Sequence, residues 1–278
     1  MKITQESWEV ARRRLRVYGG RLRRVAIGKG ISPACLFLHL PKCGGTSLSE
    51  ALYSGVPFHQ RIGVIDAVST RRAAAIDAFD TDDLMLCHED LAHGDLTFAL
   101  REKILLAHMC WDTRLIHGHV LYTDKVRAHT AGRYKVVTIM RDPVARTLSN
   151  FRMAAHNKVI PPDIEEWLSG PVGFKHATVN LRYLGGRASL PPEEAEALLP
   201  RALAAVDEFE LIGFLDETPR FLRDFEKHFG TRLSLPRSNE AKGARITLDA
   251  GQTRRLEALC AFDIEIYRRA RERFGVAL

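Results

Sequence analysis

A lysine, two glycines and two hydroxyl residues directly follow an apolar run near the start of this 278-residue chain. These five residues are Lys42, Gly44, Gly45, Thr46 and Ser47. Glycines let backbone N–H groups approach an anion, a helix N-terminus supplies positive potential, and a lysine adds a full charge. Residues 41–47 therefore predict a phosphate-binding loop between a buried strand and a helix.

The order of these residues differs from that of the ATP-binding loop G-x-x-x-x-G-K-[ST], in which the lysine follows the last glycine. Here Lys42 precedes both glycines, so we expect it to enter the site from the strand side of the turn. A plain strand-to-helix connection capped by Thr46 or Ser47 would explain the hydroxyl residues. It would give no reason for Pro41 and Lys42 or for the paired glycines.

A second candidate anion site follows residues 134–140, a β-branched apolar segment typical of a buried strand. Arg141 comes directly after it, Pro143 suits the start of a helix, and Ser149 lies about two helical turns further on. Arg141 would then lie at the carboxyl end of a strand, where open α/β sheets bind ligands. Its planar guanidinium can bind a phosphate through two hydrogen bonds.

His117 and His119 flank a glycine just before this second strand. On an extended segment, side chains two residues apart point to the same face. Histidine, with an ordinary pKa near about 6.5, is suited to take a proton from a hydroxyl at neutral pH. Glu89 and Asp90 are rival candidates for this base, although a solvated polar turn explains them more simply. A metal site is disfavoured, because no third ligand stands at a convincing spacing from the two histidines.

The two anion motifs and the histidine pair together resemble the sulfotransferases that use 3′-phosphoadenylyl sulfate (PAPS). Residues 41–47 resemble their 5′-phosphosulfate loop, and residues 141–149 resemble their Arg-Asp-Pro-x-x-Arg-x-x-Ser signature. The order His-Gly-His-Val, strand, Arg-Asp-Pro is similar to that of the uronyl 2-O-sulfotransferases and their bacterial relatives. A softer similarity at residues 179–186, where Leu181 stands in place of the usual Thr, extends the resemblance.

The resemblance implies transfer of a sulfuryl group from PAPS to an acceptor hydroxyl, on a carbohydrate or glycolipid, by in-line displacement without a metal. The residues expected to bind PAPS are Lys42, Gly44, Gly45, Thr46, Ser47, Arg141 and Ser149. Lys42 would stabilise the charge that develops on the bridging oxygen, and Arg141 with Ser149 would hold the 3′-phosphate. His119 would be the catalytic base and His117 would assist it, with the assignment between the two left open.

The alternation of strands and helices predicts a three-layer α/β fold with a mainly parallel sheet, like the P-loop nucleotide-binding folds. Residues 209–214 predict a late strand that leads into an amphipathic helix. We expect residues 31–278 to form a single domain, with acceptor contacts from loops within residues 54–103. An ATP-dependent kinase or NTPase of related fold, with Asp216 as a weak candidate for binding magnesium, remains an alternative.

Residues 1–30 form a basic arm whose excess of seven Lys and Arg over Glu equals the formal net charge of the whole chain, +7. An apolar stripe at helical spacing runs along it, through Trp8, Ala11, Leu15, Tyr18, Leu22 and Val25. Gly19 and Gly20 would weaken one long helix by about 2 kcal/mol, so two short helices are an alternative. The arm could pack its stripe on the body, lie on an anionic membrane, or bind a polyanion, either nucleic acid or an anionic glycan acceptor. A non-catalytic polyanion-binding protein is therefore a further alternative for the function of the chain. We expect no specific nucleic acid partner.

Composition restricts where the chain is expected to work. It has no apolar run of about twenty residues and no secretory signal pattern. Its cysteines are odd in number and never form a C-x-x-C pair: Cys35, Cys43, Cys87, Cys110 and Cys260. Free thiols of this kind indicate a reducing compartment. The animal glycan sulfotransferases that the chain resembles work behind a membrane anchor, which this sequence does not show, so the resemblance implies a bacterial, cytoplasmic enzyme. Peripheral contact at the inner membrane through residues 1–30 is an open question.

Overall fold

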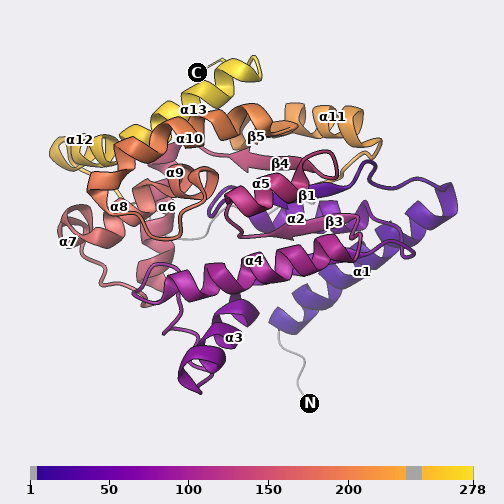
Figure 1. The fold of residues 1–278 in the computed structure, drawn as a ribbon, viewed down its shortest axis with the longest axis horizontal. Helices are drawn as coiled ribbons and strands as arrows, with labels where there is room; N and C mark the ends of the chain where they lie inside the picture. Colours follow the sequence, from indigo (N-terminus) through magenta and orange to yellow (C-terminus); the bar gives the residue numbers. More distant parts are fainter. Residues whose placement is uncertain (1–4, 236–245, 278) are drawn as a thin grey trace.

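The computed structural model describes residues 5–235 and 246–277, without the side chains of residues 5–7 and 45–46, and shows an α/β fold (Figure 1). Its strands are β1 Cys35–Leu38, β2 Ile62–Ile65, β3 Leu115–Gly118, β4 Lys135–Met140 and β5 Leu211–Phe214. They lie in the order β2-β3-β1-β4-β5, and each neighbouring pair is parallel. The expected α/β fold, with helices flanking a parallel sheet, is confirmed.

Helices surround this sheet, with α11 packed against β5 at one edge and α4 against β2 at the other (Figure 1). They are α1 Gln5–Ile27, α2 Gly45–Ser54, α3 Ala67–Phe79, α4 Gly94–Cys110, α5 Asp124–Thr130, α6 Pro143–His156, α7 Ile164–Ser169, α8 Pro171–Ala177, α9 Val179–Gly185, α10 Ala195–Glu208, α11 Thr218–Phe229, α12 Ala250–Leu259 and α13 Ala261–Arg273. Within the described ranges, no helix is both long and apolar enough to cross a membrane.

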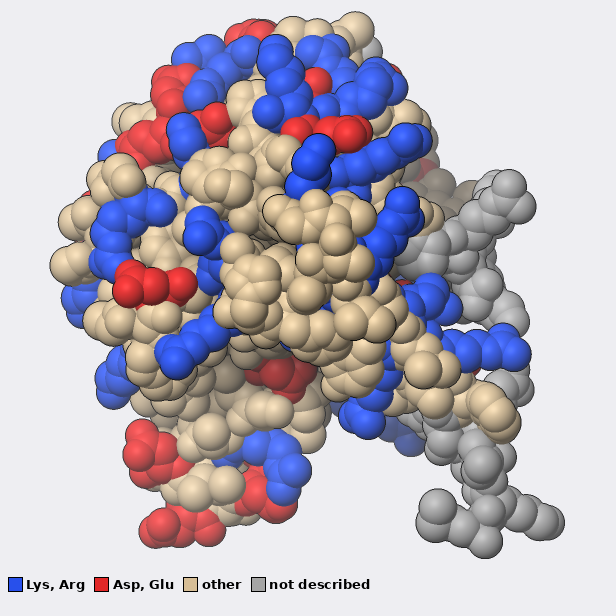
Figure 2. All heavy atoms as spheres, turned by 90° about the vertical axis from the view of Figure 1, so that its right-hand side faces the viewer, with Lys and Arg blue, Asp and Glu red and all other residues tan. Residues whose placement is uncertain are grey.

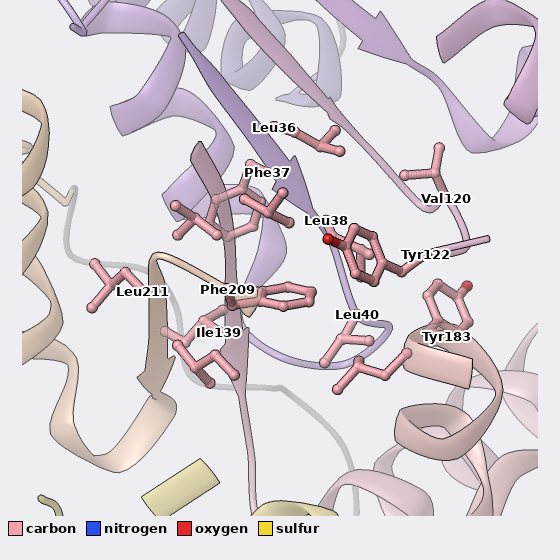
Figure 3. Close-up of a cluster of buried hydrophobic side chains, with 14 of the residues drawn as sticks. Leu36, Phe37, Leu38, Leu40, Val120, Tyr122, Ile139, Tyr183, Phe209 and Leu211 are labelled. Carbon is pink, nitrogen blue, oxygen red and sulfur yellow. The ribbon is translucent and has the colours of Figure 1, made fainter. Parts of the chain in front are cut away.

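The strand β1 is the centre of the hydrophobic core. Phe37 and Leu38, whose side chains point to opposite faces of the strand, are both almost fully buried, as expected of a central strand in a parallel sheet. Apolar side chains from β4, β5 and the segments beside them surround β1, among them Ile139, Leu211 and Phe209 (Figure 3). The strands that end in the predicted functional motifs are therefore held by one continuous core.

The basic arm forms one continuous helix, α1, so the alternative of two short helices separated by the glycines is wrong. Gly20 lies against the C-terminal end of α2, and a Cβ at this position would overlap the side chain of Ser54. The glycine thus allows α1 to approach α2 closely, and this packing compensates for its low helix propensity.

The orientation of α1 contradicts the interpretation in which its apolar stripe packs on the body. Trp8, Leu15 and Leu22 are 56%, 71% and 63% exposed. Four arginines face the body instead: Arg13 and Arg16 form ion pairs with Glu50 of α2, and Arg21 and Arg24 bind backbone carbonyls. The helix is therefore attached through its polar face, and its apolar side points to solvent.

A buried ion pair connects the helices α6, α8, α9 and α13 behind the site. Arg146 of α6 is fully buried and donates hydrogen bonds to Asp263 of α13, at 3.3 Å, and to the carbonyl of His176, at 2.6 Å. The carboxylate of Asp263 also accepts the backbone N–H groups of Asn180 and Leu181 in the first turn of α9. The middle arginine of the Arg-Asp-Pro-x-x-Arg-x-x-Ser segment thus orients α6 from inside.

We expect Asp263→Ala to lower the free energy of unfolding by about 3–5 kcal/mol, because Arg146 would keep a buried charge without its partner. Denaturant unfolding monitored by circular dichroism measures this change. The matched control is Glu194→Ala, which removes an exposed ion pair with Arg187 and should cost less than about 1 kcal/mol. Equal losses in the two variants would contradict the structural role of Asp263.

Candidate functional site

A cleft of about 1100 Å³ opens at the carboxyl edge of the sheet. The residues directly after β1, β3, β4 and β5 all line it: His39, His119, Arg141 and Leu215. From β1 the chain continues toward β2 and β3, whereas from β4 it continues to β5 on the other side. The cleft therefore lies at the point where the strand order reverses, which is where open α/β sheets bind ligands.

The predicted phosphate loop connects β1 to α2 beside this cleft. Lys42 and Gly44 both have positive φ angles, 65° and 81°, and a Cβ on Gly44 would lie 2.7 Å from the side chain of Leu215. Gly44 is the N-cap of α2 and provides no side-chain cap, so the first N–H groups of the helix are available to a ligand. Gly45 begins α2, and Ser47 lines the cleft.

The side chain of Thr46 lies outside the part of the chain that the structure describes, although its backbone belongs to the first turn of α2. Its predicted contact with a phosphosulfate remains a prediction.

Two cationic side chains from the two motifs meet in the cleft. Lys42 and Arg141 both line it, and Ser149 of α6 lies on the same wall. Burial lowers the pKa of Lys42, and the positive charges of Arg141 and Arg152 lower it further. Among the described side chains, none of these three cations forms an ion pair with a carboxylate. Positive charges held together in this way favour the binding of an anion.

His119 has a defined tautomer. Its Nδ1 lies 2.7 Å from the backbone carbonyl oxygen of His39. Because a carbonyl oxygen can only accept, Nδ1 must carry the proton and Nε2 must be the unprotonated nitrogen. The ring stacks on that of His39, with centroids 4.3 Å apart, and the residue lines the cleft. This is the arrangement needed for a general base with a fixed orientation.

His117 is placed differently, although it lies only two residues away. Its ring is buried behind the cleft, where Nδ1 is 2.8 Å from the hydroxyl of Tyr53 and Nε2 is 3.3 Å from that of Ser49. Its ring centroid lies 5.0 Å from that of His39, but His117 is not among the residues that line the cleft. The geometry therefore favours His119 as the base and assigns His117 a supporting position between α2 and His39.

All three histidines are held in the neutral form. Burial lowers the pKa of His39 to about 4. Burial also lowers the pKa values of His117 and His119 well below the ordinary value, and the neighbouring His39 lowers both further. His39 was not identified from the sequence. Its position next to His119 follows from the pairing of β1 with β3, which the sequence does not give. In that pairing Phe37 lies beside His117, and His39 therefore lies beside His119.

The rival bases Glu89 and Asp90 also line the cleft, but Glu89 forms ion pairs with Arg71 and Arg101, and Asp90 lies against His176. Burial alone would raise the pKa of Glu89, but the cations of Arg101 and Arg71 outweigh it and hold that pKa low. Asp90 pairs with His176 at 3.0 Å, and its pKa is also lowered, because this neighbour outweighs the effect of burial. Carboxylates stabilised in their ionised form are weak proton acceptors.

The Glu89 ion pair has a structural role next to the base. Arg101 is fully buried, and besides binding Glu89 it donates to the hydroxyl of Thr70 at 2.9 Å and to the carbonyl of His119 at 3.3 Å. It thus links α3, α4 and the loop before α4 to the backbone of the candidate base. Sequence reasoning missed this residue, because an arginine inside an amphipathic helix carries no local signal of burial.

Comparisons with known proteins add no family assignment to this geometry. A search of protein-family models finds no match to the chain, and a search of curated proteins finds none either. Within the described residues, no group of three or more His, Cys, Asp or Glu side chains is arranged to hold a metal ion. The resemblance to PAPS-dependent sulfotransferases therefore depends on residues 41–47, 117–119 and 141–149, together with the cleft that these segments share.

Proposed function

We propose that this chain is a sulfotransferase that moves a sulfuryl group from PAPS to a hydroxyl of a carbohydrate or glycolipid acceptor. The observation that carries the proposal is the meeting of Lys42, Arg141, Ser149 and His119 in one cleft. These residues come from three separate segments: the loop between β1 and α2, the residue after β3, and the segment that runs from the end of β4 into α6. At about 1100 Å³ the cleft is large for a single small ligand, for which about 300–1000 Å³ is usual, and it has room for donor and acceptor.

The donor would be held through its two charged ends. The N-terminus of α2, with Gly44, Gly45, Thr46 and Ser47, would bind the 5′-phosphosulfate. Arg141 and Ser149 would bind the 3′-phosphate. Lys42 and Arg141, whose positive charges disfavour each other in the free protein, would then each have an anionic partner. This supports the binding of an anionic donor in the cleft.

The acceptor hydroxyl would attack sulfur while the bond from sulfur to the bridging oxygen breaks. The hydroxyl proton passes to Nε2 of His119, and the electron pair of the broken bond stays on the 5′-phosphate of the leaving adenosine 3′,5′-bisphosphate. Lys42 would stabilise the charge on that oxygen. His117 would keep α2 and His39 in place, and through His39 it would maintain the orientation of His119.

The two alternative functions explain less of the site. A kinase or NTPase would need a residue to bind magnesium, but its weak candidate, Asp216, forms an ion pair with Arg271 at 2.9 Å. A non-catalytic site for a polyanion would account for the basic helix α1. It would give no reason for the fixed tautomer of His119 or for the arrangement of Lys42 and Arg141. The bacterial, cytoplasmic setting stays a prediction.

We expect Arg141→Ala to weaken the binding of adenosine 3′,5′-bisphosphate about 10- to 100-fold, because a charged hydrogen bond to the 3′-phosphate is lost. Binding of AMP, which lacks this phosphate, should stay within about twofold. Isothermal titration calorimetry without magnesium measures both affinities. Arg187→Ala, at an exposed arginine that pairs with Glu194, is the control and should change neither. A loss equal for both nucleotides, or a magnesium-dependent preference for ATP, would overturn the donor assignment.

We expect His119 to be protonated on Nδ1 alone at pH 7 and to titrate below pH 6.5. Its pKa is lowered, so the neutral form persists as the pH falls through 6.5, and imidazolium appears only at lower pH. Nitrogen-15 NMR of the histidine rings measures tautomer and titration, with His119→Gln used to assign the signal. A proton on Nε2 at pH 7, or a midpoint above pH 6.5, would remove His119 as the base.

We expect His119→Ala to bind adenosine 3′,5′-bisphosphate normally and to lose about 10²- to 10⁴-fold in turnover, the usual contribution of a positioned general base. The assay follows radiolabelled sulfate from PAPS into a panel of carbohydrate and glycolipid acceptors. The control is His129→Ala, which changes another histidine on α5, away from the residues that line the cleft. Near-native turnover of the His119 variant would show that another group takes the proton.

A further inference from the structure

The solvent-facing side of α1 is apolar along most of its length. It consists of Trp8, Ala11, Leu15, Tyr18, Leu22 and Val25, which we call the α1 outer face. At 3.6 residues per turn these positions lie on one side of the helix, and they span about 26 Å along its axis. An exposed apolar strip of this length is unusual on a protein surface and marks a place where something binds.

Arginines border the α1 outer face on both sides. By helical position, Arg12 and Arg23 flank it on one side and Arg14 on the other. All three are exposed, and none forms an ion pair with a carboxylate of a described side chain. Figure 2 shows Lys and Arg side chains protruding at the lower right, where α1 lies, with almost no Asp or Glu among them.

The helix is fixed in this orientation by contacts on its opposite side. Arg16 binds Glu50 at 2.7 Å, Arg21 donates to the carbonyls of Val56 and Gln60 at 3.1 and 3.0 Å, and Arg24 donates to the carbonyl of Arg232, just after α11. Turning the apolar residues inward would break all of these contacts. The exposure of the α1 outer face is therefore a feature of the packed protein.

We propose that the α1 outer face binds the surface of an anionic lipid bilayer. Its apolar side chains would enter the boundary between head groups and acyl chains, and Arg12, Arg14 and Arg23 would bind lipid phosphates. A nucleic acid fits the arginines but not the apolar strip between them. A second copy fits the strip, but pairing two α1 helices would bring their arginines together without acidic partners.

The lipid surface would lie next to the cleft, because α1 also forms one of its walls. Glu9, Arg12, Arg13 and Arg16 all line the cleft. These residues lie mostly on the side of α1 opposite to the outer face, so a protein bound through that face would hold the cleft about one helix diameter, roughly 10–12 Å, from the bilayer surface. This consequence rests on the proposed sulfotransferase function, and it points to an acceptor sugar that is carried on a lipid.

The test is co-sedimentation of the full chain with phosphatidylcholine vesicles and with mixed phosphatidylcholine–phosphatidylglycerol vesicles, without nucleotide. The donor proposal therefore does not influence the result. We expect the protein to prefer the anionic vesicles, and Leu15→Glu with Leu22→Glu to lose about tenfold or more in affinity. The control is Val68→Glu with Ile76→Glu, which makes the same charge change at exposed apolar residues of α3 and should leave binding within about twofold.

A second readout separates insertion from simple charge attraction. Tryptophan emission should shift to shorter wavelength on anionic vesicles, and this shift should be lost in Trp8→Phe while co-sedimentation persists. Equal binding by wild type and the Leu15 and Leu22 variant would overturn the proposal. So would a wild-type dimer that becomes monomeric in this variant in light scattering, or tighter binding to duplex DNA than to anionic vesicles at physiological ionic strength.

Discussion

The parallel pairing of β1 with both β3 and β4 is the constraint on which the site depends. One register places Phe37 beside His117, and the other places the same residue beside Val137. The three strands therefore end at the same edge, and the segments that leave them have to share one space. Lys42, His119 and Arg141 meet because a buried core holds β1, β3 and β4 side by side. Each of these residues follows its strand by no more than a few positions, so the strands determine where they lie.

In the cleft, burial disfavours the charged form of each ionisable side chain, and neighbouring charges either offset this effect or add to it. The outcome differs between Glu89, Lys42 and His119. Glu89 is buried but stays ionised, because two arginines contact it. Burial lowers the pKa of Lys42, and the charges of Arg141 and Arg152 lower it further, so the charged form of Lys42 is destabilised in the free protein. His119 avoids the conflict by being neutral. The part of the cleft around Glu89 is therefore already neutralised by ion pairs. The part around Lys42 and Arg141 would be neutralised by an anionic ligand.

Much of this site follows from local sequence, and the remainder depends on contacts between distant segments. Lys42, Gly44 and Arg141 could be placed at strand ends because the apolar runs before them are continuous and the following residues suit helix starts. The strand β2 was not predicted, since four residues that include Gly63 carry too little periodicity. His39 and Arg101 were missed because their roles depend on β3 and on Glu89. The outward direction of the α1 outer face was equally hidden, since the periodicity of a stripe does not say which side of a helix meets the body.

The most direct test of the central claim is a crystal structure of the protein with adenosine 3′,5′-bisphosphate. We expect the 5′-phosphate at the N-terminus of α2, within hydrogen-bond distance of Lys42 and Ser47, and the 3′-phosphate against Arg141 and Ser149. Nε2 of His119 should face the space next to the 5′-phosphate. A nucleotide bound outside this cleft, or bound in it with the 3′-phosphate away from Arg141, would contradict the account.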